Sequence, residues 1–360
     1  MRPNGLEPVR QRIPCQPNCP TRNRRLRCGR KAHPMTTHRQ RLEACLSGET
    51  LDRPPVALWR HFPVDDQHPD TLASAIIQWQ NTFDWDLVKV TPASSYCLKD
   101  WGVEDIWEGS AEGTRRYTKR IISAPEDWTQ LPVLDADSPY LAAQLRCLSI
   151  LRAELDRDTP LIQTIFSPLS QAKNLAGGET LLVHLRQKPD LVWRGLEVIA
   201  ESTRRFIRAA RTMGLIDGIF YAVQHAQAHL LTKDEFNEFG RAIDLSVLES
   251  ARLLWCNMLH IHGEHIYFNT LADYPVHIIN WHDRDTAPSL AEAQTRTRAA
   301  LCGGLRRETL VYGTPNDILD EAQNALDQTG GRKLILGTGC VVETIAPYGN
   351  LLTVRKAMEA

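Results

Sequence analysis

Short apolar runs and amphipathic stretches alternate along most of this chain. Strands are predicted where apolar residues run together between prolines, glycines or polar clusters, and helices where apolar residues recur every three or four positions. The predicted strands span residues 54–60, 87–93, 159–166, 218–224, 255–263, 276–283, 305–313 and 332–340. The predicted helices span residues 68–83, 191–214, 232–254, 265–274, 287–301, 315–329 and 349–358.

This alternation predicts an α/β fold in the form of a single (β/α)₈ TIM barrel over residues 35–360. Strands separated by helices favour a parallel sheet, and about eight such units favour a closed barrel over an open doubly wound sheet. No Gly-x-Gly-x-x-Gly segment follows the first strand, which argues against a Rossmann domain. Residues 94–140 show neither period, so we expect them to form a long excursion from the barrel.

Residues 1–34 differ in composition from the rest of the chain. They hold nine Lys or Arg against one acid, Glu7, are rich in Pro and Asn, and show no periodic apolar face. Such a composition predicts a disordered basic tail. Met35 follows directly and opens a helix-like stretch, so the alternative interpretation is that residues 1–34 are a mis-called start.

The overall composition is that of an ordinary globular enzyme. Apolar residues make up 42% of the chain, charged residues 24%, and the formal net charge is −1, which gives no indication of nucleic-acid binding. No apolar run is long enough to predict a membrane span. The nine cysteines are scattered and odd in number. We therefore expect a cytoplasmic protein without structural disulfides, and a homodimer as the default assembly.

Polar side chains gather where several predicted strands end. In a TIM barrel the carboxyl ends of the strands and the loops after them form the active face. The side chains in question are Arg60, His61, Gln224, His225, His260, His262, Glu264, His282, Asp283 and Cys340. We therefore expect them to surround one mouth.

The sharpest pattern among them is His260-Ile261-His262. Residues two apart in a strand point to the same side, so both imidazoles could bind one ion. Cys340 ends the last predicted strand and could complete a His₂Cys zinc site, with Glu264 or water as the fourth ligand. The alternative interpretation is two hydrogen-bonded core histidines and an inert buried cysteine.

Several segments resemble the uroporphyrinogen decarboxylase superfamily, from about residue 36 to residue 360. LHIHGEH (259–265) resembles the Leu-His-x-Cys-Gly segment of its zinc-dependent methyltransferases, and LILGTGCVVETIAPYGNLLTVRKA (334–357) resembles their closing segment. The opening strand (54–62), the stretch 218–239 and the penultimate strand and helix (302–326) resemble the superfamily more generally. This chain departs from the methyltransferases at His262, where they usually carry cysteine.

The resemblance implies a TIM-barrel enzyme that transfers a methyl group to a thiol from a methylcorrinoid carried by a partner protein. Zinc would be held by His260, His262 and Cys340, with Glu264 as a displaceable ligand. Arg60 would pair with an anionic group of the substrate, Gln224 and His225 would face the substrate, and Asp283 would contact it or orient a ligand histidine.

Two other functions stay open at this point. The first is uroporphyrinogen decarboxylation, as part of tetrapyrrole synthesis. It is weakened because the family's second arginine is replaced by Val64 and its catalytic aspartate by Thr91 or Pro92. The second is a non-catalytic barrel that binds a corrinoid or a tetrapyrrole.

Overall fold

The computed structural model describes residues 36–359, which belong to one compact unit, Thr36–Ala360. The predicted basic tail, residues 1–34, lies outside the described residues. Within them, seven parallel strands form one sheet in the order β1-β4-β5-β6-β7-β8-β9. These strands are β1 (Val88–Val90), β4 (Leu161–Phe166), β5 (Gly218–Val223), β6 (Met258–Ile261), β7 (Ile278–Trp281), β8 (Ala300–Leu305) and β9 (Leu334–Thr338).

The predicted first strand, residues 54–60, closes this sheet into a barrel. It pairs with β9 at an isolated bridge between Val56 and Leu336, where Ala57 N donates to Leu336 O at 3.0 Å. On its other side, Asp86 N donates to Val56 O at 2.9 Å, just before β1 begins. The fold is therefore the (β/α)₈ TIM barrel that the sequence predicts.

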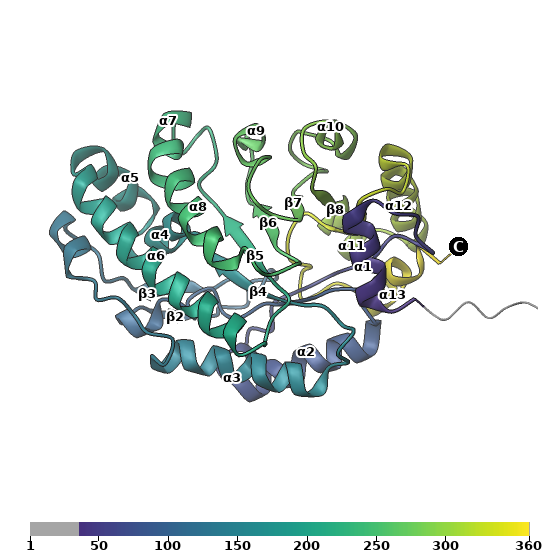
Figure 1. Cartoon of the computed structure of the whole chain (residues 1–360), viewed down its shortest axis with the longest axis horizontal. Coiled ribbons are helices and arrows are strands. Elements are labelled where there is room, and N and C mark those ends of the chain that lie inside the picture. The colour runs from purple at the N-terminus through teal and green to yellow at the C-terminus, as the bar shows by residue number, and fades with distance from the viewer. Residues whose placement is uncertain (1–35, 360) are drawn as a thin grey trace, which may run out of the picture. The chain divides into compact units, whose positions relative to one another are not determined.

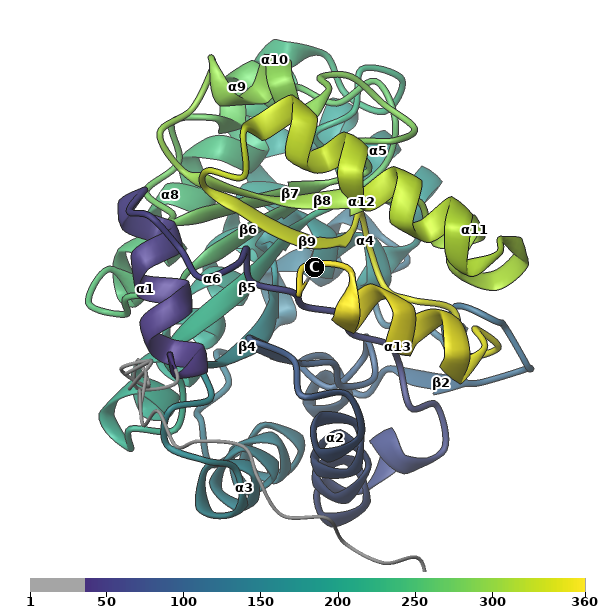
Figure 2. The same cartoon turned by 90° about the vertical axis from the view of Figure 1, so that its right-hand side faces the viewer.

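Helices surround the strands on the outside, as the two views in Figures 1 and 2 show. The longer ones are α2 (Pro69–Phe83), α3 (Pro139–Glu154), α4 (Pro168–Ala176), α5 (Gly178–Gln187), α6 (Pro189–Thr212), α12 (Pro315–Thr329) and α13 (Tyr348–Lys356). The shorter ones are α7 (Lys233–Phe236), α8 (Ala242–Leu248), α9 (Phe268–Leu271), α10 (Leu290–Gln294) and α11 (Arg307–Tyr312). The helix predicted over 232–254 is divided, because a π-helical turn (Asn237–Arg241) separates α7 from α8.

Helix α1 (His38–Ser47) covers the end of the barrel at which the strands begin. Its Arg41 forms an ion pair with Asp86 at 2.6 Å, and its Cys45 Sγ lies 3.4 Å from the carbonyl oxygen of Leu334, the first residue of β9. The opposite end, where the strands finish, is therefore the end available for a functional site.

The strand predicted over residues 305–313 is wrong. Strand β8 ends at Leu305, and the following residues form α11; the helix predicted over 287–301 also shrinks to α10. The pair Gly303-Gly304 is typical of a turn but lies inside β8. Glycine is needed at position 303 because a Cβ there would lie 2.4 Å from Asp283 Oδ1. Close packing, and not a turn, therefore explains the glycine.

The excursion at 94–140 contains a small antiparallel pair, β2 (Glu104–Ile106) and β3 (Arg116–Lys119). Its tip reaches the end of the barrel at which β9 finishes, because Thr344 N donates to Ala111 O at 2.7 Å. The excursion therefore contributes to the wall around that end.

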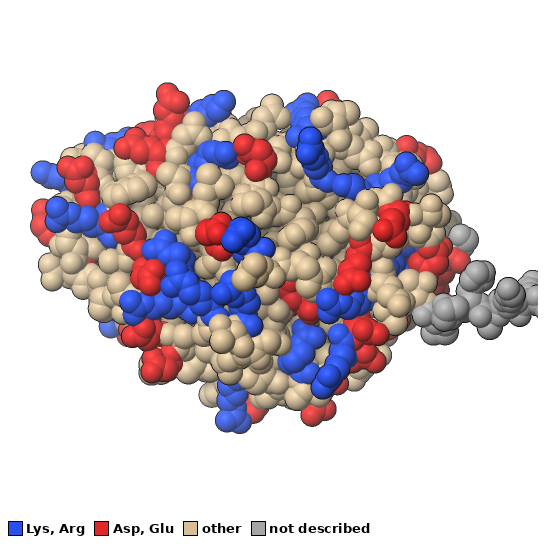
Figure 3. Space-filling model, in the orientation of Figure 1, with Lys and Arg blue, Asp and Glu red and all other residues tan. Residues whose placement is uncertain are grey.

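Charges of both signs are mixed over the face shown in Figure 3. The basic side chains of α6 follow this pattern, since Arg204, Arg205 and Arg208 all lie within 4 Å of Glu201, at 2.9, 3.0 and 3.7 Å. Glu201 therefore offsets part of the positive charge on this helix face. Among residues 36–359 no helix has both the length and the apolar character that crossing a membrane requires.

Candidate metal centre

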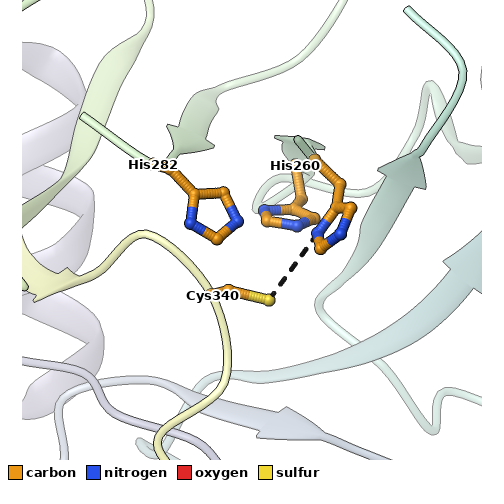
Figure 4. Close-up of side chains that lie close together, drawn as sticks. His260, His282 and Cys340 are labelled. Atoms are coloured by element: carbon orange, nitrogen blue, oxygen red, sulfur yellow. Dashed lines mark hydrogen bonds between the residues drawn. The ribbon is translucent and has the colours of Figure 1, made fainter. Parts of the chain in front are cut away.

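Four side chains that can bind a metal ion meet where three strands end. His260 lies in β6 and His262 follows this strand directly, His282 follows β7, and Cys340 lies two residues after β9. Their ligand atoms all lie within 4.8 Å of one another. In Figure 4 the rings of His260 and His282 and the sulfur of Cys340 face the same small region.

The backbone explains why these four side chains converge. His260 and His262 share one side of β6, and β7 runs in register with it, so that His260 lies opposite Asn280. His282, two residues after Asn280, is therefore level with His262. The closing segment reaches them because Gly339 packs directly on β7, where a Cβ would lie 2.6 Å from the Cα of His282.

The distances suit a tetrahedral site for a small ion. Cys340 Sγ lies 4.0 Å from His262 Nδ1, and the three imidazole ring centres are 5.3 to 6.1 Å apart. Zinc bound tetrahedrally by nitrogen and sulfur separates its ligand atoms by about 3.3–3.7 Å. Nε2 of His282 is buried and makes no hydrogen bond among the described residues, so it is available as a ligand. The residues present therefore fit zinc.

The charges of the cluster support the same assignment. Burial disfavours a thiolate at Cys340, but the positive charge of His260 and the contacts with the three imidazoles outweigh it, so the pKa of Cys340 falls well below its usual value. Burial lowers the pKa of His260, which favours the neutral imidazole that binds metals. A thiolate beside imidazoles is the donor set of a His/Cys zinc site.

The fourth side chain of the cluster is His282, to which the sequence analysis assigned no role. Glu264 was the expected candidate, but its side chain is exposed and it is not part of the cluster. A pattern in the sequence could have indicated His282, because Asn280 and His282 alternate along β7 as His260 and His262 do along β6.

Lys89 of β1 is a buried residue near the cluster that no pattern in the sequence singles out. Its Nζ lies 4.3 Å from the centre of the Phe220 ring and 5.7 Å from that of Trp59. Phe220 in turn stacks on His260, with ring centres 5.1 Å apart. Burial lowers the pKa of Lys89 to about 7. An amine therefore lies inside the barrel, on the aromatic residues that support the metal cluster.

Arg60, predicted to bind an anionic group of the substrate, lies on the other side of its strand from the barrel interior. Its guanidinium stacks over Trp79 and Phe62, at 4.8 and 5.1 Å, and donates to Thr344 O at 3.4 Å. The preceding residue, Trp59, contacts Phe220 inside the barrel, so Arg60 must point away from it. The structure thus places Arg60 between the strand and α2.

Gln224 and His225, predicted to face the substrate, lie directly after β5. Gln224 Oε1 accepts a hydrogen bond from Lys173 Nζ at 3.3 Å. His225 is 3% exposed, and its Nδ1 has no hydrogen-bond partner among the described residues. Burial, together with the charges of Lys173 and His262, lowers the pKa of His225 to about 3. Neutral His225 is thus coupled electrostatically to the cluster.

Asp283, predicted to contact the substrate or to orient a ligand, turns toward β8. Both of its carboxylate oxygens accept from Gly304 N, at 3.1 and 3.2 Å. Burial raises the pKa of Asp283 to about 7. Its hydrogen bonds among the described residues therefore join two strands and do not reach a ligand histidine.

Comparison with known proteins agrees with the resemblance seen in the sequence. The model of the uroporphyrinogen decarboxylase (URO-D) family matches residues 37–360. A methylcobamide:CoM methyltransferase, MtaA, of Methanosarcina barkeri is 24% identical over 336 residues, which cover 88% of this chain and 95% of that protein.

Solved structures share the fold. A methyltransferase from Methanosarcina mazei superposes with a TM-score of 0.78 at 20% identity, over 89% of this chain and 98% of that one. A B12-independent methionine synthase from Shewanella sp. W3-18-1 gives a TM-score of 0.53 at 15% identity, over 84% and 91%. The family match spans almost the whole barrel, and the chain therefore belongs to the uroporphyrinogen decarboxylase (URO-D) family.

Proposed function

We propose that this protein is a zinc-dependent methyltransferase that moves a methyl group from a methylcorrinoid, carried by a partner protein, to a small-molecule thiol. The observation that carries the proposal is the convergence of His260, His262, His282 and Cys340, with their ligand atoms within 4.8 Å of one another. The relatives named above, which are methyltransferases, support the same reaction class.

In this proposal the four side chains would hold the ion at the mouth of the barrel, and the substrate thiol would bind it as a fifth ligand or in place of one imidazole. Bound there, zinc would lower the pKa of a substrate thiol, so that thiolate forms near neutral pH. The thiolate sulfur would then form a bond to the methyl carbon, and the corrinoid would keep the electron pair of the broken cobalt–carbon bond. The thiol proton would leave to solvent.

The groups around the cluster suit a thiol that carries negative charge. Lys89 lies inside the barrel without a carboxylate partner among the described residues, and Arg307, which pairs with Glu112 at 2.7 Å, also feels the charge of the Cys340 sulfur. Lys173 lies beside Gln224, close to His225. These cations would attract an anionic substrate into the mouth.

The test combines metal analysis with a methyl-transfer assay. Purified protein should contain about one zinc per chain and should demethylate methylcobalamin when a thiol such as 2-mercaptoethanesulfonate is supplied. Cys340→Ala should lose both properties. Cys147→Ala, which removes a buried thiol from α3 far from the cluster, should keep both. Protein without stoichiometric metal would refute the zinc site, and zinc-loaded protein inactive with every thiol tested would refute the reaction.

A further inference from the structure

Asn280 of β7 is a fully buried amide whose polar atoms all have partners. Its Nδ2 donates to the carbonyl oxygens of Cys302 and Thr338, at 2.8 and 2.9 Å. Its Oδ1 lies 2.7 Å from Nδ1 of His260. The side chain is 0% exposed, so none of these bonds can be exchanged for water.

These partners determine the orientation of the amide and, through it, the proton on His260. Carbonyl oxygens only accept, so the NH₂ group of Asn280 must face Cys302 and Thr338. Oδ1 then faces His260 and can only accept, so Nδ1 of His260 carries a proton. In a neutral imidazole this leaves the lone pair on Nε2, which becomes the atom that can bind a metal ion.

The same amide also connects the segments that carry the ligands. Asn280 lies opposite His260 of β6 in the strand register and two residues before His282. Its bond to Thr338 O holds the backbone of β9 two residues before Cys340. One side chain thus contacts the strands from which all four ligands of the cluster come.

We propose that Asn280 is a positioning residue of the metal centre. It keeps His260 in the Nδ1–H tautomer, aims Nε2 at the ion, and fixes the spacing between β6, β7 and β9. The neutral amide leaves His260 a neutral ligand, whereas a carboxylate would place negative charge against two carbonyl oxygens. The metal part of this inference rests on the proposed function, but the tautomer is a property of the metal-free protein.

The experiment compares Asn280→Ala with a matched variant at a second buried amide. Asn257, just before β6, also donates from Nδ2 to two carbonyl oxygens, those of Ala251 and Leu254, and accepts from Ile219 N. It lies at the opposite end of β6 from His262. Asn257→Ala therefore measures the structural cost of losing such an amide without touching the cluster.

Two readouts separate positioning from structure. The ¹⁵N chemical shifts of His260 in metal-free protein should show the Nδ1–H form in wild type and in Asn257→Ala, and a shift toward Nε2–H in Asn280→Ala. Zinc affinity, measured by competition with a chromophoric chelator, should fall about 10–100-fold in Asn280→Ala and less than about twofold in Asn257→Ala. An unchanged tautomer and an unchanged affinity in folded Asn280→Ala would overturn the proposal.

A measurement on the wild type covers the case in which Asn280→Ala does not fold. The Oδ1 of Asn280 can only accept from His260, so metal-free wild-type protein should hold His260 in the Nδ1–H form. An Nε2–H tautomer in the metal-free wild type would also overturn the proposal. Wild-type protein that binds no zinc would instead refute the proposed function, and the tautomer in metal-free protein would still decide whether Asn280 positions His260.

Discussion

The sulfur of Cys340 lies 4.0 Å from Nδ1 of His262, although 78 positions separate the two residues in the sequence. The barrel brings them together, since β6 and β9 end at the same mouth. The contact also defines what is unusual in this chain. The methyltransferases that it resembles usually carry cysteine where His262 stands, so its cluster holds three nitrogen donors and one sulfur donor.

Replacing His262 by cysteine should therefore change the ion's surroundings in a visible way. A second thiolate should strengthen zinc binding, because soft sulfur ligands favour zinc and add negative charge to the site. In the Co²⁺-substituted protein, the sulfur-to-metal charge-transfer absorption should roughly double per bound ion. Wild-type protein, in which Cys340 is the one sulfur ligand of the cluster, calibrates the intensity expected for a single thiolate. An unchanged intensity in His262→Cys would show that position 262 does not bind the ion.

Removing the His282 imidazole tests whether it is a ligand. Changes to residues that only support a ligand lower metal affinity by about 10–100-fold. His282→Ala removes a ligand itself, so it should lower zinc affinity by more than that. The matched control is His277→Ala at the other end of the same strand, where Nδ1 accepts from Asn257 N at 3.0 Å. That variant should lose stability but bind zinc as the wild type does. Equal zinc affinity in both variants, measured by chelator competition, would remove His282 from the site.

The alternation of strands and helices predicted the barrel because apolar runs mark the strands, whereas apolar residues recur every three or four positions in the helices. The same reasoning failed at β8, where glycines that look like a turn are required by the packing of Asp283 and of α12. A single sequence does not show which neighbour will occupy the space above a glycine. Boundaries that depend on such packing were therefore predicted wrongly, while β1, β4, β5, β6, β7 and β9 all lie within the predicted strand ranges and are shorter than them.

The candidate site was predictable to the extent that it depends on strand periodicity. His260 and His262 share a side of one strand, and Cys340 ends the last one, so their convergence follows from a closed barrel. His282 stands at the end of the next predicted strand and alternates with Asn280 there, but that it lies level with His262 depends on the register between β6 and β7. Arg60 was assigned to the mouth from its place near a strand end, but alternation along that strand turns Trp59 inward and Arg60 outward.

Lys89 offers a test that combines stability with function. Its pKa is lowered to about 7 by burial, against about 10.4 in an unfolded chain, so folding is penalised fully below pH 7. The penalty declines as pH rises from about 7 to about 10.4, because the unfolded state then releases its proton as well. Lys89→Met should therefore raise the free energy of unfolding by about 2–4 kcal/mol at pH 6 and by much less at pH 10.

The same variant should lose methyl-transfer activity, since a buried amine kept at a cost in stability is typical of a functional group. Lys188→Met, at an exposed position beside α6, serves as the control and should leave both properties unchanged. Urea denaturation at pH 6 and pH 10, with activity measured at pH 7, checks both expectations. A destabilised Lys89→Met at pH 6 would show that the ammonium is well solvated or paired in the folded protein.

Asp86 should be the main cause of lost stability in acid at the end of the barrel where the strands begin. It is 0% exposed and accepts hydrogen bonds from Arg41, Arg53 and the backbone N–H of Val56, at 2.6, 2.6 and 2.8 Å. Burial disfavours the carboxylate, but the hydrogen bonds from His38 and Arg53 outweigh it, so the pKa of Asp86 lies well below its ordinary value. Asp86→Asn leaves buried guanidinium groups without their anion, which should cost about 3–5 kcal/mol.

The sign of the pH dependence follows from the direction of this shift. A depressed pKa contributes stability that is complete above the unfolded value of about 3.9 and is lost as pH falls toward the folded value. The gap in unfolding free energy between wild type and Asp86→Asn should therefore be widest near pH 5–6 and narrow below about pH 4. Metal binding should not change, because Asp86 lies where β1 begins and the cluster lies where the strands end. A gap that stays constant from pH 6 to pH 3 in urea denaturation would mean that Asp86 has an ordinary pKa in the folded protein.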